Sequence, residues 1–176
     1  MTSLATKVTA ALAVCDSATA SDNARGAALE TLAESLFGSV PGIDFTSRNS
    51  KDAFATQEID VAVWNDGHGD GLAGFPPVFL VECKSWSSPV GSMEVAWFDT
   101  KLRLKGCSFG VLLALNGITG QPHSLTAAHS IVAAALREER NLVVLTRADL
   151  LTVSKPADLV NLIKKRTVQN RVSRPF

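Results

Sequence analysis

Two carboxylates and a lysine lie within apolar segments of this chain. Asp60 lies in QEIDVAVW at 57–64, and Glu82 and Lys84 lie in VFLVECK at 78–84. Because side chains alternate along a strand, Glu82 and Lys84 would share one face, about 7 Å apart. Burying a charge costs several kcal/mol unless the charge is paired or bound to a metal. We therefore interpret these three residues as a functional site in which the charged side chains take part in catalysis or binding.

Glu30 is a further candidate for this site. The apolar positions of 22–37 recur with the period of a helix that buries one face. On that helix Glu30 stands about 100° from Leu29, at the margin of the buried stripe. Gly26, one turn earlier, allows the helix to approach its neighbour closely. A carboxylate at this margin can point along a sheet surface into a pocket shared with the other two.

The elements that must position these residues follow from hydropathy patterns. If the two apolar segments pair as a hairpin, Asp60 and Glu82 converge at its splayed end. Helices and strands alternate in the rest of the chain, which indicates an α/β fold with a central mixed β-sheet flanked by helices. The patterns predict helices over 3–14, 22–37, 92–105, 124–139, 149–153 and 156–166, and strands over 43–47, 57–64, 78–84, 109–115 and 141–145.

Length and composition narrow the class of protein. The 176 residues fit one domain, and 46% hydrophobic with 19% charged residues excludes wholesale disorder. No apolar stretch is long enough for a membrane helix, and the first residues resemble an amphipathic helix rather than a secretory signal. Three cysteines without a Cys/His cluster indicate no zinc site, and we expect a reducing, cytoplasmic location.

The net charge of zero conceals an asymmetry along the chain. From Arg137 onward nine Lys and Arg residues stand against four Asp and Glu, whereas 1–136 carries eight against thirteen. A basic C-terminal third beside an acidic body favours a surface that faces a polyanion. A solvated helix with a basic tail would give the same count, so both interpretations stay open.

Three short motifs match known sites only in part. GxGxxG at 69–74 leads into a strand rather than a helix, so it does not form a dinucleotide site. The calcium-like run that begins at Asp66 has Pro77 where its bidentate glutamate belongs. GxSxG at 106–110 lies between a helix and a strand, the reverse of a nucleophile elbow. A hydrolase that uses Ser108 is therefore the weakest alternative.

The order of the charged residues resembles the PD-(D/E)xK nuclease superfamily, and more closely its Mrr-like restriction endonuclease branch. The matching motifs are GAALE at 26–30, EIDV at 58–61 and VECK at 81–84, with Ile59 at the position of the motif's proline. GVLLALNGITG at 110–120 and VLTRADL at 144–150 are similar to the later strands and turns of that branch. The resemblance implies a restriction-endonuclease-like core.

The resemblance also implies a metal-dependent DNA endonuclease that serves restriction, defence or DNA processing. Glu30, Asp60, Glu82 and the backbone carbonyl of Cys83 would bind Mg²⁺, for which Mn²⁺ is a possible substitute. Glu30, Asp60 and Glu82 together with Lys84 would form the catalytic set. Lys84 would orient the attacking water and help to deprotonate it, or would stabilise the transition state.

Further residues are candidates for contacts with DNA. Lysines, arginines and hydroxyls bind phosphates without reading sequence, and tryptophans can stack on bases. We expect an N-terminal helical extension at 1–20, the nuclease-like domain at 21–155 and a C-terminal helix with a basic tail at 156–176. The candidates are Arg48, Lys51, Trp86, Ser87, Lys164, Lys165 and Arg166.

Two questions of partnership stay open at this stage. Such domains often act as homodimers, or rely on a partner subunit for specificity, because two DNA strands need two sites. No membrane partner is expected. The main alternative function is a catalytically inactive nucleic-acid-binding or interaction module with the same fold.

Overall fold

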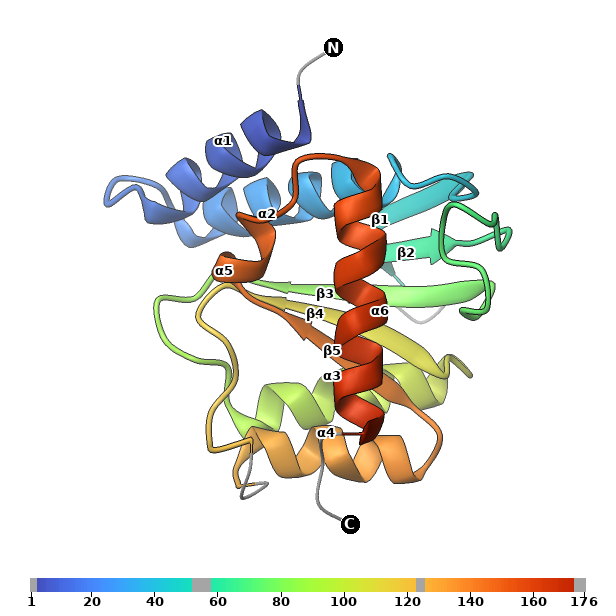
Figure 1. Cartoon of the computed structure of the whole chain (residues 1–176). Helices are drawn as coiled ribbons and strands as arrows, with labels where there is room; N and C mark the ends of the chain where they lie inside the picture. Colours follow the sequence, from blue (N-terminus) through green and yellow to red (C-terminus); the bar gives the residue numbers. More distant parts are fainter. Residues whose placement is uncertain (1–2, 52–57, 123–125, 173–176) are drawn as a thin grey trace.

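The computed structural model describes residues 3–51, 58–122 and 126–172, and within them helices and strands alternate as expected for an α/β domain (Figure 1). Two helices come first, three strands follow, and helices then connect the remaining strands. The elements are α1 Leu4–Asp16, α2 Asp22–Phe37, β1 Phe45–Lys51, β2 Glu58–Trp64, β3 Val78–Lys84, α3 Ser92–Leu104, β4 Phe109–Ala114, α4 Ala128–Arg137, β5 Asn141–Leu145, α5 Arg147–Leu150 and α6 Pro156–Val172.

The five strands form one mixed sheet in the order β1-β2-β3-β4-β5. β1 pairs with β2, and β2 with β3, in antiparallel fashion. β3, β4 and β5 are parallel, because α3 and α4 carry the chain back across one face between successive strands. The expected mixed sheet flanked by helices is confirmed, with β3 at the junction of its antiparallel and parallel halves.

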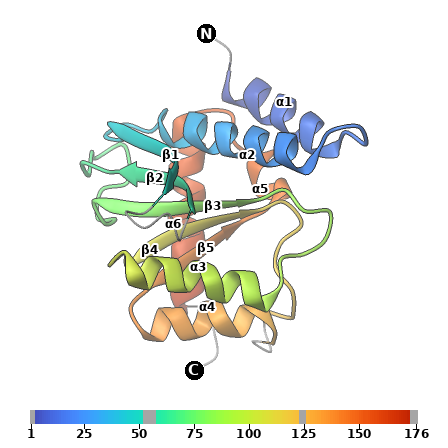
Figure 2. The same cartoon turned by 180° about the vertical axis from the view of Figure 1, so that it is seen from behind.

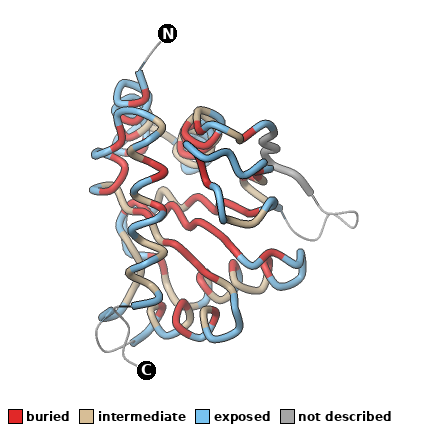
Figure 3. The backbone as a smooth tube through the Cα atoms, turned by 45° about the vertical axis from the view of Figure 1, so that its right-hand side comes forward, coloured by how far each residue is buried: buried red, intermediate tan, exposed pale blue. Residues whose placement is uncertain are grey.

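Helices cover both faces of the sheet (Figures 1 and 2). α2 and α6 pack on one face, where Val81 and Leu113 join the core, and α1 packs against α2. α3 and α4 pack on the other, where Leu80 and Leu112 belong to a second apolar cluster. Neighbouring residues of one strand thus enter opposite cores, as strand geometry requires. Figure 3 shows the buried residues concentrated in the central strands and on the inward sides of the helices.

Most element boundaries agree with the sequence pattern, and α6 differs most. This helix extends six residues past 166 because its last turns are held to β5 by polar contacts. Asn170 Nδ2 donates a hydrogen bond to the Leu142 carbonyl at 2.7 Å, an interaction without a hydrophobic signature. α5 begins at Arg147, where Thr146 and Asp149 form a capping box. Among the described residues, no helix has the length and apolarity needed to cross a membrane.

The long connection between β2 and β3 is tied to itself. Asn65 follows β2 and is only 3% exposed, and its Nδ2 donates to the carbonyls of Leu72, Phe75 and Pro76. The backbone N–H of Asn65 donates to the Pro77 carbonyl at 2.7 Å. These bonds close the loop and keep β2 and β3 in register at the opposite end of the hairpin from the charged residues.

Candidate active site

The antiparallel ladder between β2 and β3 ends at the charged residues. Its last pair toward this end is Val61 with Val81, so the next position would place Asp60 opposite Glu82. The Asp60 carboxylate instead accepts the backbone N–H of Cys83 through Oδ2 at 2.7 Å. A side chain therefore replaces a backbone acceptor where the strands separate, and Asp60 is anchored beside Glu82.

Glu82 is a buried carboxylate between two lysines. It is 4% exposed, and each oxygen contacts one ammonium group. Lys84 Nζ lies 2.9 Å from Oε1, and Lys101 Nζ lies 2.7 Å from Oε2. Because low-polarity surroundings penalise an unpaired charge, these two ion pairs offset the cost of burying the Glu82 carboxylate.

Lys101 was not among the residues expected from the sequence. It lies on α3 and is 6% exposed, on the side that buries Phe98 and Leu102. Its position three residues after Phe98 places it on the inward stripe, where a lysine is out of place unless it meets a buried acid. That mismatch between residue type and position is the signal that identifies it.

Asp60 has an elevated pKa. Burial disfavours its charged form and the negative charge of Glu82 adds to the effect, which together raise the pKa of Asp60 to about 6. The hydrogen bond from Cys83 N–H and the charges of Lys84 and Lys101 act in the opposite direction. The carboxylate is therefore short of compensating positive charge, a property that favours binding of a cation.

Lys84 remains a cation in this environment. Burial lowers the pKa of its ammonium group, but the charge and hydrogen bond of Glu82 outweigh burial and raise the pKa above its usual value. The Nζ atom also lies 5.8 Å from the ring centre of Trp86, within cation–π range. A protonated lysine can attract and orient anionic oxygens, but it does not accept a proton.

Glu30 approaches the site from α2, on the other face of the sheet from Glu82. Its side chain is half-buried and turns back toward Gly26, where a Cβ would lie 4.0 Å from Oε1. Its negative charge helps raise the pKa of the Cys83 thiol, although burial is the main cause. Glu30 is therefore a neighbour of Cys83 rather than a direct contact of Glu82.

The expected ligand set of Glu30, Asp60, Glu82 and the Cys83 carbonyl stays a prediction. Among the residues that the structure describes, no three His, Cys, Asp or Glu side chains form a group able to hold a metal ion. Glu30, Asp60 and Glu82 converge on the same end of the hairpin but do not surround one point. Glu30 comes from α2 on the other face of the sheet, and the two lysines hold both oxygens of Glu82.

Two of the expected DNA contacts follow β3 directly. Trp86 is 43% exposed and Ser87 is exposed, and both line a polar cavity beside the site. Asn116, just past β4, donates through Nδ2 to the Trp86 carbonyl at 2.5 Å and so fixes this loop against the sheet. Two further candidates, Arg48 and Lys51, lie on β1 opposite Val61 and Glu58, and their side chains lie outside what is described.

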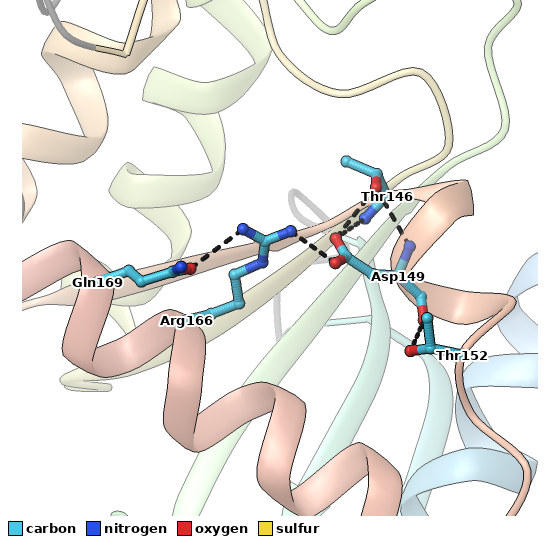
Figure 4. Close-up of polar contacts among 5 residues, drawn as sticks. All are labelled: Thr146, Asp149, Thr152, Arg166 and Gln169. Atoms are coloured by element: carbon cyan, nitrogen blue, oxygen red, sulfur yellow. Dashed lines mark hydrogen bonds and ion pairs between the residues drawn. The ribbon is translucent and has the colours of Figure 1, made fainter.

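The three basic candidates on α6 differ from one another. Lys164 and Lys165 are exposed. Arg166 instead faces the body of the protein, where Nη2 contacts Asp149 Oδ1 at 2.5 Å and Nη1 donates to Gln169 at 3.1 Å (Figure 4). Its guanidinium is engaged in holding α6 to α5, which argues against the expected phosphate contact.

A mixed sheet with two carboxylates and a lysine at the splayed end of its antiparallel hairpin defines an α/β protein with a restriction-endonuclease-like core. Residues 21–151 match the model of the Mrr_cat restriction endonuclease family, and the chain belongs to this family. Enzymes of this kind generally use divalent metal ions. No curated protein and no solved structure matches the chain.

Proposed function

We propose that this protein is a metal-dependent DNA endonuclease whose catalytic set is Asp60, Glu82 and Lys84, with Glu30 at its edge. The observation that carries the proposal is the junction of Asp60 with β3, where its carboxylate accepts the Cys83 N–H beside Glu82 and Lys84. Membership in a restriction endonuclease family supports phosphodiester hydrolysis as the reaction. Restriction, defence or DNA processing would be its setting in the cytoplasm.

The donor atoms suit Mg²⁺, with Mn²⁺ as a substitute. Asp60, Glu82, the Cys83 carbonyl and Glu30 offer only oxygens, the ligands that hard divalent cations prefer. Both oxygens of Glu82 are bonded to lysines, so cation binding would compete with one of these ion pairs. When bound, such an ion lowers the pKa of a coordinated water and neutralises charge that develops on phosphate oxygens.

The side chains of the chain itself have separable roles in this proposal. Lys84 stays protonated, so it would stabilise negative charge on the phosphoryl oxygens and orient the attacking water rather than deprotonate it. Lys101 would balance the buried charge of Glu82 and compete with a cation for its second oxygen. The Cys83 N–H would fix the orientation of Asp60.

The remaining expected contacts stay proposals. Trp86 and Ser87 would meet the DNA strand next to Lys84, and Arg48, Lys51, Lys164 and Lys165 would contact phosphates farther along. A homodimer or a partner subunit would supply the second site needed to cut both strands.

The test is cleavage of supercoiled and linear DNA with Mg²⁺, Mn²⁺ or EDTA. Asp60→Asn and Lys84→Met should abolish nicking, as should EDTA, whereas the exposed controls Asp70→Asn and Lys7→Met should cleave like the wild type. Nicking that survives EDTA or either site variant would reject the mechanism. DNA binding without cleavage under every condition would favour the alternative, a non-catalytic binding module.

A further inference from the structure

A polar cavity of about 480 Å³ lies at the carboxyl ends of the parallel strands, next to the candidate active site. Ser85, Trp86 and Ser87 come directly after β3, Asn116 follows β4, and Arg147 begins α5 after β5. In α/β sheets this end of the strands is where ligands bind. Trp86 connects the cavity to the site, because its ring lies 5.8 Å from Lys84 Nζ.

Two arginines from distant parts of the chain line this cavity. Arg25 comes from α2 and Arg147 from α5, and both lower the pKa of the Cys15 thiol, which burial raises overall. Arg25 Nη2 donates to the Ser17 carbonyl at 3.0 Å and Nη1 to the exposed Asp22 at 3.3 Å, while its buried Nε has no hydrogen-bond partner among the described residues. Because both guanidinium groups line the cavity, their charge is available to an anion that enters it.

Asp16, at the end of α1, is the acidic residue of the cavity. Its carboxylate takes two hydrogen bonds from Arg147, from Nη2 at 2.6 Å and from Nη1 at 2.8 Å. The lining then carries two positive charges and one negative charge, with the hydroxyls of Ser85 and Ser87 as neutral donors. A planar guanidinium that binds a carboxylate through two parallel bonds has the geometry to bind a phosphate in the same way.

We propose that this cavity binds a backbone phosphate of the DNA strand, next to the phosphate at which the strand is cleaved. Asp16 competes with the bound phosphate for Arg147. The inference rests on the proposed function for the identity of the ligand. The cavity and its two arginines do not include the catalytic carboxylates. The inference gives α1 a role, since this helix, outside the matched residues 21–151, supplies the competing carboxylate.

Two variants that break the same ion pair provide the test. Duplex binding is measured by fluorescence anisotropy in EDTA, which prevents cleavage, over a range of salt concentrations. Arg147→Gln should weaken binding roughly five- to tenfold and reduce the slope of log affinity against log salt by about one. Asp16→Asn should strengthen binding, because Arg147 is then free for the phosphate. Arg25→Gln should weaken binding as Arg147→Gln does.

Matched controls account for the change in net charge. Arg137→Gln and Glu139→Gln make the same charge changes at exposed positions near the start of β5, the opposite end of the sheet, and should leave the slope unchanged. If the ion pair were only structural, Arg147→Gln and Asp16→Asn would shift binding in the same direction or not at all. Either result would overturn the proposal.

Two further measurements identify the source of the phosphate and separate this proposal from the proposed function. The variants should change the affinity equally for duplexes with and without a 5′-phosphate. A change limited to the phosphorylated duplex would mean that the cavity binds a terminal phosphate rather than a backbone phosphate. If the wild-type protein binds no duplex, the proposed function fails. Titration with inorganic phosphate, followed by NMR, then tests whether the cavity binds an anion. Shifts of the Arg25 and Arg147 Nε–H resonances would support an anion site, and the absence of shifts would reject it.

Discussion

Lys101 Nζ lies 2.7 Å from Glu82 Oε2, and the side chains of both residues are almost completely buried. The contact joins α3 to the middle strand of the sheet at the candidate site. It is more than a structural ion pair, because Lys84 contacts the other oxygen of the same carboxylate at 2.9 Å. A cation that binds Glu82 therefore has to compete with two resident ammonium groups.

Replacing Lys101 should separate stability from cation affinity. Lys101→Met leaves Glu82 with one partner in a buried position, and we expect a loss of about 3 kcal/mol in the free energy of unfolding. The same variant should bind Mn²⁺ more tightly, because it removes a competitor for Oε2. Urea unfolding and isothermal titration calorimetry measure the two effects, with Lys7→Met as the exposed control. Weaker Mn²⁺ binding in Lys101→Met would show that the lysine orients Glu82 rather than competes for it.

The elevated pKa of Asp60 predicts a stability that depends on pH. Because the pKa in the fold is about 6 and the usual value is 3.8, folding favours the protonated form. Its contribution is complete below about pH 4 and is lost as the pH rises through about 6. Asp60→Asn removes this loss and keeps an oxygen to accept the Cys83 N–H. At about pH 8 we therefore expect the variant to be more stable than the wild type by roughly 1–3 kcal/mol.

Urea unfolding in EDTA across this pH range measures the difference. The gap between Asp60→Asn and the wild type should shrink toward acid, while the exposed Asp70→Asn should show no gap at any pH. A variant that is less stable than the wild type near neutral pH would mean that the ionised carboxylate stabilises the fold, contrary to the burial argument.

Divalent cations should reverse this order of stability. An ion that binds only the folded protein stabilises it, by about 2.7 kcal/mol at a concentration of 100 Kd. We expect Mg²⁺ or Mn²⁺ to raise the Tm of the wild type and to leave Asp60→Asn and Glu82→Gln unchanged. Differential scanning fluorimetry with and without EDTA measures the shift, and Glu34→Gln on α2 is a carboxylate control. Equal shifts in all four proteins would place cation binding elsewhere.

The meeting of Asp60 and Glu82 could be predicted from the sequence because its signals are local. Alternation within 57–64 and 78–84 indicates two strands, and a long loop between them indicates a hairpin whose far end carries both carboxylates. The outcome agrees: the ladder stops at Val61 and Val81, just before the charged pair.

Other parts of the site depend on contacts that no local pattern encodes. Lys101 was missed because a search for apolar helix faces passes over a buried lysine, although an isolated acid in an apolar strand requires a partner. The pairing of Glu82 with lysines, rather than with Glu30 and Asp60 around one point, depends on the exact reach of α3. The cavity of Asp16, Arg25 and Arg147 joins the consecutive helices α1 and α2 to α5, which lies far along the chain, so only the folded structure reveals it.

The contact between Arg166 and Asp149 leads to the last prediction, which separates structure from DNA binding on α6. Asp149 is 8% exposed and closes the capping box of α5, with Oδ2 accepting the Thr146 N–H at 2.9 Å (Figure 4).

Arg166→Gln removes the charged partner of Oδ1 and should lower the free energy of unfolding by about 1–3 kcal/mol. Duplex affinity in EDTA should not change, because this guanidinium is engaged by Asp149 and Gln169. The neighbouring exposed Lys165→Gln should do the reverse, with little loss of stability and a reduced salt slope of binding. A drop in duplex affinity for Arg166→Gln at a temperature where it is fully folded would restore this arginine to the DNA-contacting surface.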